Sequence, residues 1–352
     1  FMARKLIVDS LKYWVSEYHV DGFRFDLMGL LDTVTVLKGY EECYKIKKDI
    51  LFIGEGWKMY NGRAGTVGMD QNYMMNTDKV SVFNDEFRDL TKKGGMNELD
   101  KAFLSGGNVY IPDLFCNICG KPVRNYSSKM PANSVLYLDC HDGLTLHDNL
   151  VLNCDIDESS DKGRKLIEKK IKLANALLLT SQGIAFLHAG QEKMRTKSSL
   201  GCAEESFNEC IKQFVRNSYK SSDAINQIKW YLDDSENSVY GYTKALISLR
   251  RRYGAFRIGN AEYVMERIFL LGEFCKEHLL VYKILDSGYG DTQVGDWYLC
   301  FNSGENDEII PFLYPEKFYV YVDENEVFLD GKPLGKNSVC VKANSALILR
   351  VR

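Results

Sequence analysis

Charged side chains stand in this sequence at points where apolar, strand-like runs come to an end. In "VDGFRFD", Arg24 and Asp26 are two residues apart in a run that is otherwise apolar. Strand side chains alternate between faces, so these two charges share one side and Phe23 and Phe25 share the other. We expect Arg24 and Asp26 to point together into a cavity, where an ionised carboxylate can serve as a nucleophile. A structural ion pair is the commoner meaning of such a spacing when it is seen alone.

Two further apolar runs end on the same kind of residue. Glu55 lies between glycines in "IGEGW", where Trp57 could form a platform for a sugar ring, and "CHDG" contains His141 and Asp142. Retaining cleavage of a glycosidic bond uses two carboxylates about 5–5.5 Å apart, one as the nucleophile and one as the acid and then the base. A third carboxylate and a histidine can stabilise a sugar that gains positive charge. Together, the three strand ends indicate a sugar-cleaving site.

The elements that must position these residues alternate between short strands and helices. The predicted strands cover residues 20–26, 49–55, 79–85, 134–142 and 182–192, and helical spacing precedes the first and the last of them. This alternation predicts an α/β fold with a parallel sheet, and catalytic groups at the ends of several strands are typical of a (β/α)₈ TIM-type barrel. A barrel needs eight strands, so we expect residues 1–258 to be the later β/α units, about strands 4–8, of a larger catalytic domain.

A different pattern begins at about Glu262. The segments "HLLVYKIL", "WYLCFNS", "FYVYVDENEVFLDG" and "NSVCVKANSALILRV" are short, rich in β-forming residues and joined by Gly, Asn and Asp. Such segments predict an antiparallel β-sandwich. We expect residues 259–352 to form this second domain.

Composition excludes several classes of partner. The 352 residues have a net charge of −3 and are 45% hydrophobic, and no apolar run is long enough to cross a membrane. We therefore expect neither nucleic acid nor a membrane as a partner. The ten cysteines favour a reducing, cytoplasmic location over secretion. Cys116 and Cys119 form a CxxC pair without a second pair nearby, and we interpret them as a turn with reduced thiols rather than a metal site.

Three of these phrases resemble signature regions of a known enzyme group. "DGFRFD", "GEGW" and "CHDGLTLHD" are similar to three signature regions of the α-amylase superfamily, glycoside hydrolase family thirteen. The longer phrases "YHVDGFRFDLMGLLD", "LANALLLTSQGIAFLHAGQE" and "NSYKSSDAINQIKW" resemble type I pullulanases, which debranch α-1,6-glucosidic links. The resemblance runs from about residue 3 to residue 256.

The resemblance implies a role for each residue that matches a motif. Asp26 would be the nucleophile with Arg24 as its charge partner, and Glu55 the general acid/base. Asp142 would stabilise the transition state, and His141 would donate a hydrogen bond to the substrate. The reaction implied is the retaining hydrolysis of α-1,6 branch links in α-glucans such as pullulan, amylopectin and glycogen limit dextrins. The implied partner is an α-glucan polysaccharide or oligosaccharide.

The chain also departs from the family pattern. The superfamily's first signature region and the upstream pullulanase hallmark are absent, so we expect the earlier part of the barrel as a further partner. Calcium ligands in the superfamily come largely from that earlier part, and we assign no metal and no cofactor. Gly143 stands where most pullulanases have Asn, which is closer to isoamylases and glycogen-debranching enzymes. An extra stretch, residues 198–216, is expected to influence substrate access.

Two alternatives to a pullulanase therefore stay open. One is an isoamylase-type or glycogen-debranching hydrolase, which would accept glycogen and reject pullulan. The other is a truncated, inactive protein that only binds glucan. Catalytically silent relatives typically lose their carboxylates, and this chain has all three.

Overall fold

The first part of the chain forms a parallel sheet of five strands in sequence order. The computed structural model describes residues 2–200, 210–286, 295–335 and 337–351. The strands of this sheet are β1 (Gly22–Phe25), β2 (Leu51–Gly54), β3 (Ser81–Phe83), β4 (Ser134–Leu136) and β5 (Ile184–Ala185). The helices of this part are α1 (Met2–Tyr18), α2 (Thr33–Ile46), α3 (Asp85–Thr91), α4 (Ile111–Ile118), α5 (Leu146–Asn153) and α6 (Asp161–Thr180). The predicted parallel sheet is confirmed.

The first β/α unit shows why the sequence folds this way locally. Phe23 and Phe25 both pack against Phe52 of β2, with ring centroids 5.6 and 5.2 Å apart. This contact buries the apolar face of β1 beneath α1 and α2 and leaves Arg24 on the opposite face. Asp32 caps α2 by accepting a 2.9 Å hydrogen bond from the backbone N–H of Thr35, which starts the helix directly after the site-bearing turn.

The later strands are shorter than predicted. β4 ends at Leu136 and β5 has two residues, so the second halves of the predicted strands 134–142 and 182–192 are loops. In the segment that follows β4, side chains accept several of the backbone N–H groups, for example Asp139 at Leu146 (2.7 Å). Apolar residues continue past the end of β4 because Tyr137 and Leu138 are themselves buried, whereas Phe186 and Leu187 after β5 are only partly buried. A run of apolar residues therefore overestimated the length of both strands.

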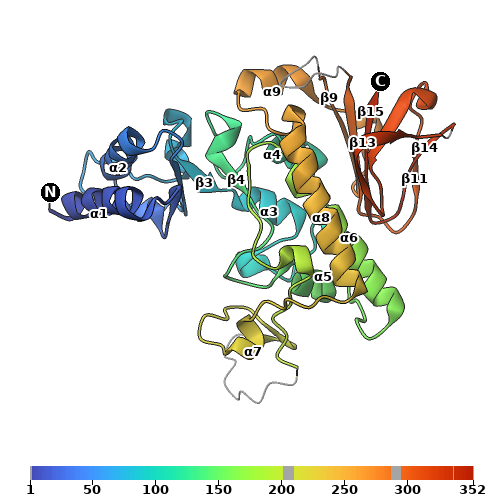
Figure 1. Ribbon diagram of the computed structural model, residues 1–352, viewed down its shortest axis with the longest axis horizontal. Coiled ribbons are helices and arrows are strands. Elements are labelled where there is room, and N and C mark those ends of the chain that lie inside the picture. Colours follow the sequence, from blue (N-terminus) through green and yellow to red (C-terminus); the bar gives the residue numbers. More distant parts are fainter. Residues whose placement is uncertain (1, 201–209, 287–294, 336, 352) are drawn as a thin grey trace.

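Two long helices lie between the parallel strands and a second, antiparallel sheet (Figure 1). α6 lies beside α8 (Asp234–Arg252), and both contribute to a core that also contains residues of the antiparallel sheet. At its centre, Trp297 packs edge-on against Tyr253, Phe256 and Tyr321, with centroids 4.7–4.9 Å apart. The antiparallel sheet is therefore joined to the parallel part by a continuous apolar core.

The antiparallel sheet has six strands in the order β13-β12-β15-β10-β9-β8. Their bounds are β8 (Ile268–Leu270), β9 (Leu279–Ile284), β10 (Trp297–Asn302), β12 (Phe318–Val322), β13 (Val327–Pro333) and β15 (Ser345–Val351). A separate pair, β11 (Glu308–Ile310) with β14 (Val339–Val341), covers the face turned away from the helices and encloses a second apolar cluster. The β-rich part of the chain begins later than the predicted position, Glu262. Helix α9 (Ala261–Arg267) comes before the first of these strands.

The short elements after β5 are β6 (Cys210–Ile211), β7 (Phe214–Val215) and α7 (Asp223–Asn226). The predicted turn holds only the second cysteine of the CxxC pair: Cys116 belongs to α4, and Cys119 is the C-cap residue at which the turn begins. Both thiols are free, and the described residues contain no group of three or more His, Cys, Asp or Glu side chains that could hold a metal ion. Within the same described part, no helix is long and apolar enough to span a membrane.

Candidate active site

Four of the six predicted site residues line one open pocket of about 810 Å³ at the ends of the parallel strands. They are Arg24, Glu55, Trp57 and His141. These residues come from three separate strand ends, as the sequence pattern required. The remaining lining residues are Phe83, Tyr137, Cys140 and Phe186.

The Arg24 guanidinium binds two of the three predicted carboxylates at once. Its Nη1 donates to Asp26 Oδ1 at 2.8 Å, and its Nη2 donates to Glu55 Oε1. Such charge-assisted hydrogen bonds are the strong ones in proteins, and the planar fork of arginine fixes their direction. One cation thus keeps two carboxylates side by side, although they are 29 residues apart in the sequence.

The backbone around the β1 turn also holds Glu55. The Leu27 N–H donates to Glu55 Oε2 at 2.9 Å, and the Glu55 N–H donates to the Phe25 carbonyl at 3.1 Å. Leu27 adopts φ 42°, a left-handed conformation that costs a non-glycine residue about 1–2 kcal/mol. At Gly29, a Cβ would stand 1.8 Å from the Trp57 carbonyl oxygen, so only glycine permits this close approach of the two loops. The left-handed conformation of Leu27 and the close contact of Gly29 with Trp57 belong to the turn that directs the Leu27 N–H toward Glu55.

Asp26 occupies a different position from the one that strand alternation predicts. β1 ends at Phe25, so Asp26 lies in the turn beyond the strand and is not one of the residues that line the pocket. Its side chain is 74% exposed, against 13% for Glu55. The ion pair with Arg24 keeps its carboxylate beside the pocket.

The third strand end forms a turn that exposes its functional side chains. His141 and Asp142 are 61% and 64% exposed, and His141 Nε2 lies 3.3 Å from Asp142 Oδ2. Gly143 follows with φ +78°, and a Cβ there would stand 2.6 Å from Glu98 Oε1. The glycine that departs from the pullulanase pattern is therefore favoured at this position, because the Cβ of any other residue, even of an Asn, which tolerates positive φ, would displace the Glu98 carboxylate.

We expect Gly143→Ala to lower the free energy of unfolding by about 1–2 kcal/mol, because alanine disfavours the left-handed conformation and its Cβ would displace Glu98. The control is Gly241→Ala in α8, where an added Cβ meets nothing within 4 Å. The Gly241→Ala substitution should raise the free energy of unfolding by about 0.5–1 kcal/mol, since glycine weakens a helix interior. Urea unfolding of both variants measures the difference. Equal changes in the free energy of unfolding at both positions would show that the turn at position 143 accepts a side chain as readily as the helix does.

The floor of the pocket is aromatic and was missed by the sequence interpretation. Phe83 packs edge-on against Tyr137 and Phe186, with both centroid distances 5.3 Å. Each of these residues stands at or just beyond the end of its strand, on the face that also carries Arg24 and Glu55. Their position at strand ends was the signal that could have found them. An apolar floor beside charged walls suits a sugar ring, which has both apolar and polar faces.

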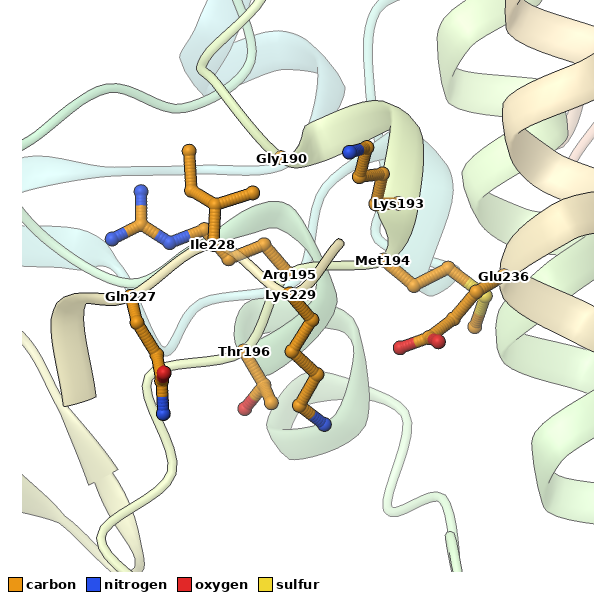
Figure 2. A pocket seen from close by; sticks show the side chains of 9 residues that line it. All are labelled: Gly190, Lys193, Met194, Arg195, Thr196, Gln227, Ile228, Lys229 and Glu236. Atoms are coloured by element: carbon orange, nitrogen blue, oxygen red, sulfur yellow. The ribbon is translucent and has the colours of Figure 1, made fainter. Parts of the chain in front are cut away.

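A second, smaller pocket of about 330 Å³ lies in the loops after β5 (Figure 2). Gly190 and residues 193–196 form one side, residues 227–229 form the other, and Glu236 of α8 completes the lining. Lys193 lies over the exposed ring of Trp230, 4.4 Å from its centroid. None of the predicted site residues lines this pocket, and its lysines, arginine and glutamate are of mixed charge, so the geometry assigns it no chemistry.

The buried side chain of His147, a few residues after Asp142, makes the stability of the folded chain depend on pH. Burial opposes a charge on His147, but hydrogen bonds to Asp148 (3.2 Å) and Glu158 (3.0 Å) prevail and raise the pKa of His147 to about 9. Its ordinary value is 6.5, so the stabilisation is complete below pH 6.5 and is lost as the pH rises through about 9. The free energy involved is on the order of 3 kcal/mol.

We therefore expect the melting temperature of the wild-type chain to fall between pH 6.5 and 9, and His147→Gln to remove most of that fall. The variant should be the less stable protein at pH 6 and should approach the wild type near pH 9. Thermal unfolding across this range measures both. If the melting temperatures of both proteins fell equally between pH 6.5 and 9, His147 would not be charged in the folded chain.

Comparison with known proteins gives named relatives of this chain. No protein-family model matches the chain. A pullulanase of Bacillus subtilis is 34% identical over 303 residues, which cover 84% of this chain and 38% of that protein. Pullulanase A of Streptococcus pneumoniae is 33% identical over 298 residues, 77% of this chain and 24% of that protein. The chain belongs to the pullulanase family.

Solved structures of this family share the fold. The crystal structure of the Group B Streptococcus pullulanase SAP matches with a TM-score of 0.89 and 31% identity, over 100% of this chain and 49% of that one. The pullulanase-family chain thus spans about a quarter to two-fifths of the two curated relatives described above. The predicted pullulanase resemblance is confirmed. The same fold places Arg24, Glu55, Trp57 and His141 around one pocket.

Proposed function

We propose that this protein hydrolyses α-1,6-glucosidic branch links in α-glucans by a retaining double displacement. The observation that carries the proposal is the Arg24 guanidinium, which holds Asp26 and Glu55 together beside an aromatic pocket. Membership of the pullulanase family supports the substrate class. A structure of the Group B Streptococcus pullulanase in complex with maltotetraose also supports an oligosaccharide ligand.

The proposed reaction has two steps. Asp26 attacks the anomeric carbon of the branch sugar, the bond to the bridging oxygen breaks, and Glu55 gives its proton to that oxygen. Glu55 then takes a proton from water, and the resulting hydroxide displaces Asp26 from the anomeric carbon. The retained configuration follows from two inversions at the same atom.

The other residues act on the charge and orientation of the sugar. Asp142 stabilises the positive charge that develops on the ring, and His141 donates a hydrogen bond to a sugar hydroxyl. Trp57 provides a face against which a sugar ring packs, continuous with the aromatic floor. No metal and no cofactor enter these steps.

We further propose that residues 1–258 are the later β/α units, about strands 4–8, of a (β/α)₈ barrel and that residues 259–352 form a β-sandwich domain. The sequential order of the five parallel strands supports a barrel, because doubly wound sheets reverse their strand order. The partner that such a barrel needs is its own earlier β/α units. The cytoplasmic location stays a prediction.

The test is product analysis of pullulan and glycogen treated with two preparations, this 352-residue chain and the protein translated from its complete reading frame. Maltotriose from pullulan establishes the proposed activity. Products from glycogen with none from pullulan would favour the isoamylase-type alternative, to which Gly143 points. Binding of maltotetraose without any product from either preparation would mean a glucan-binding protein and would overturn the proposal.

A further inference from the structure

The turn that carries His141 and Asp142 is placed by its backbone. Both side chains are largely exposed and are paired with each other. Gly143 is half-buried and Leu144 is fully buried, so the chain passes from an exposed functional turn into the core within two residues. The position of the Asp142 carboxylate therefore depends on how the peptide groups of Gly143 and Leu144 are held.

Two buried lysines bind the carbonyl groups of these residues. Lys197 is 1% exposed, and its Nζ donates to the Gly143 carbonyl at 2.5 Å and also to the Arg216 carbonyl. Lys92, at the end of α3, donates from Nζ to the Leu144 carbonyl at 3.0 Å. Burial lowers the pKa of both lysines, and the charge of Asp148 opposes this effect at Lys197.

The N–H groups of the same two residues are bound as well. Asn217 Oδ1 accepts from the Gly143 N–H at 3.1 Å, and the buried Glu98 carboxylate accepts from the Leu144 N–H. Glu98 also accepts from Arg216 Nε at 2.7 Å. All four polar backbone groups of Gly143 and Leu144 thus have side-chain partners.

These partners tie the turn to the extra stretch recognised in the sequence. Lys197 immediately precedes residues 198–216, Arg216 ends them, and Asn217 follows; residues 201–209 lie outside the described part. Lys197 is itself anchored, because its backbone N–H donates to Asp148 Oδ2 at 2.9 Å and Thr196 Oγ1 donates to Asp148 Oδ1 at 2.6 Å. The two ends of the extra stretch therefore meet at the Asp142 turn.

We propose that Lys197 is a positioning residue for catalysis: its ammonium group holds the Gly143 carbonyl and so sets where Asp142 meets the sugar. The inference rests on the proposed function, because it assigns Lys197 to the reaction of that site. Removing the ammonium leaves two carbonyls without their donor and frees the turn to shift. A shift of about 1 Å can lower a reaction rate by about 10²-fold.

The test uses Lys197→Met in the protein translated from the complete reading frame. Methionine has a stem of similar length and no donor. We expect kcat on pullulan to fall by about 10- to 100-fold while KM changes less than about threefold, because ground-state binding by the rest of the pocket survives. Hydrogen–deuterium exchange of the peptide covering residues 139–146 should become at least about tenfold faster.

The matched control is Lys170→Met. Lys170 is also a buried lysine whose Nζ binds a backbone carbonyl, but this carbonyl is that of Leu104, at 2.8 Å, and not one of the turn. We expect this variant to lose stability while its kcat and the exchange of residues 139–146 stay within twofold of the wild type. If Lys197→Met does not fold, Lys197→Gln takes its place. Its side chain is shorter and uncharged, so we expect the same direction of change in kcat and in the exchange of residues 139–146.

Two outcomes would overturn the proposal. One is exchange of residues 139–146 that matches the Lys170→Met control, and the other is a kcat within twofold of the wild type. If the wild-type protein releases no product, the proposed function fails and Lys197 has no reaction to serve. The exchange data then still decide whether Lys197 holds the turn.

Discussion

Asp26→Asn should abolish the release of maltotriose from pullulan, with a loss on the order of 10⁴-fold or more in kcat. The amide oxygen is too weak a nucleophile to form the glycosyl intermediate. The variant should still fold, because the Asp26 side chain is largely exposed. It should also still bind maltotetraose. Initial rates by reducing-sugar assay and binding by calorimetry measure the two properties separately.

The control for this variant is Asp21→Asn. Asp21 lies just before β1, is 90% exposed and pairs with Lys47 at 3.0 Å, so it is an exposed ion-paired aspartate of the same unit without a place at the pocket. The Asp21→Asn variant should have a kcat within about twofold of the wild type, because exposed ion pairs contribute at most about 1 kcal/mol to stability. Hydrolysis by Asp26→Asn at a rate near that of the control would remove Asp26 as the nucleophile.

Glu55→Gln should lower kcat on pullulan by about 10²- to 10⁴-fold, because the leaving sugar oxygen then departs without a proton. Both Glu55 oxygens accept hydrogen bonds, from Arg24 and from the Leu27 N–H, and an amide can keep only one of these. A structural effect must therefore be separated from a chemical one. An aryl α-maltotrioside provides the separation, since its phenolate leaves without protonation.

The expected result for Glu55→Gln is a much smaller loss on the aryl substrate than on pullulan. Glu41→Gln is the control, because Glu41 is an exposed residue of α2 that pairs with Lys79 at 3.3 Å, away from the pocket. Its activity on both substrates should equal that of the wild type. An equal loss by Glu55→Gln on both substrates would assign Glu55 a structural role instead of acid/base catalysis.

The sequence by itself determined the residue types of the site and the strands that carry them. Alternation in β1 correctly separated Arg24 from Phe23 and Phe25, because a two-residue period is a local property of any strand. The repeated pattern of strand, polar end and helix also predicted the parallel sheet. The ends of parallel strands meet at one edge of a sheet, so Arg24, Glu55 and His141 could be expected around one pocket.

Only the tertiary structure decided how these residues are held. The shared guanidinium between Asp26 and Glu55 depends on the left-handed turn at Leu27, which nothing in the local sequence demands. Likewise, Lys197 reaches Gly143 across 54 residues, and the sequence shows it only as one lysine in a polar loop. Strand periodicity is a short-range property. The partner of a buried charge is chosen by packing between distant segments, since an unpaired one is costly to bury.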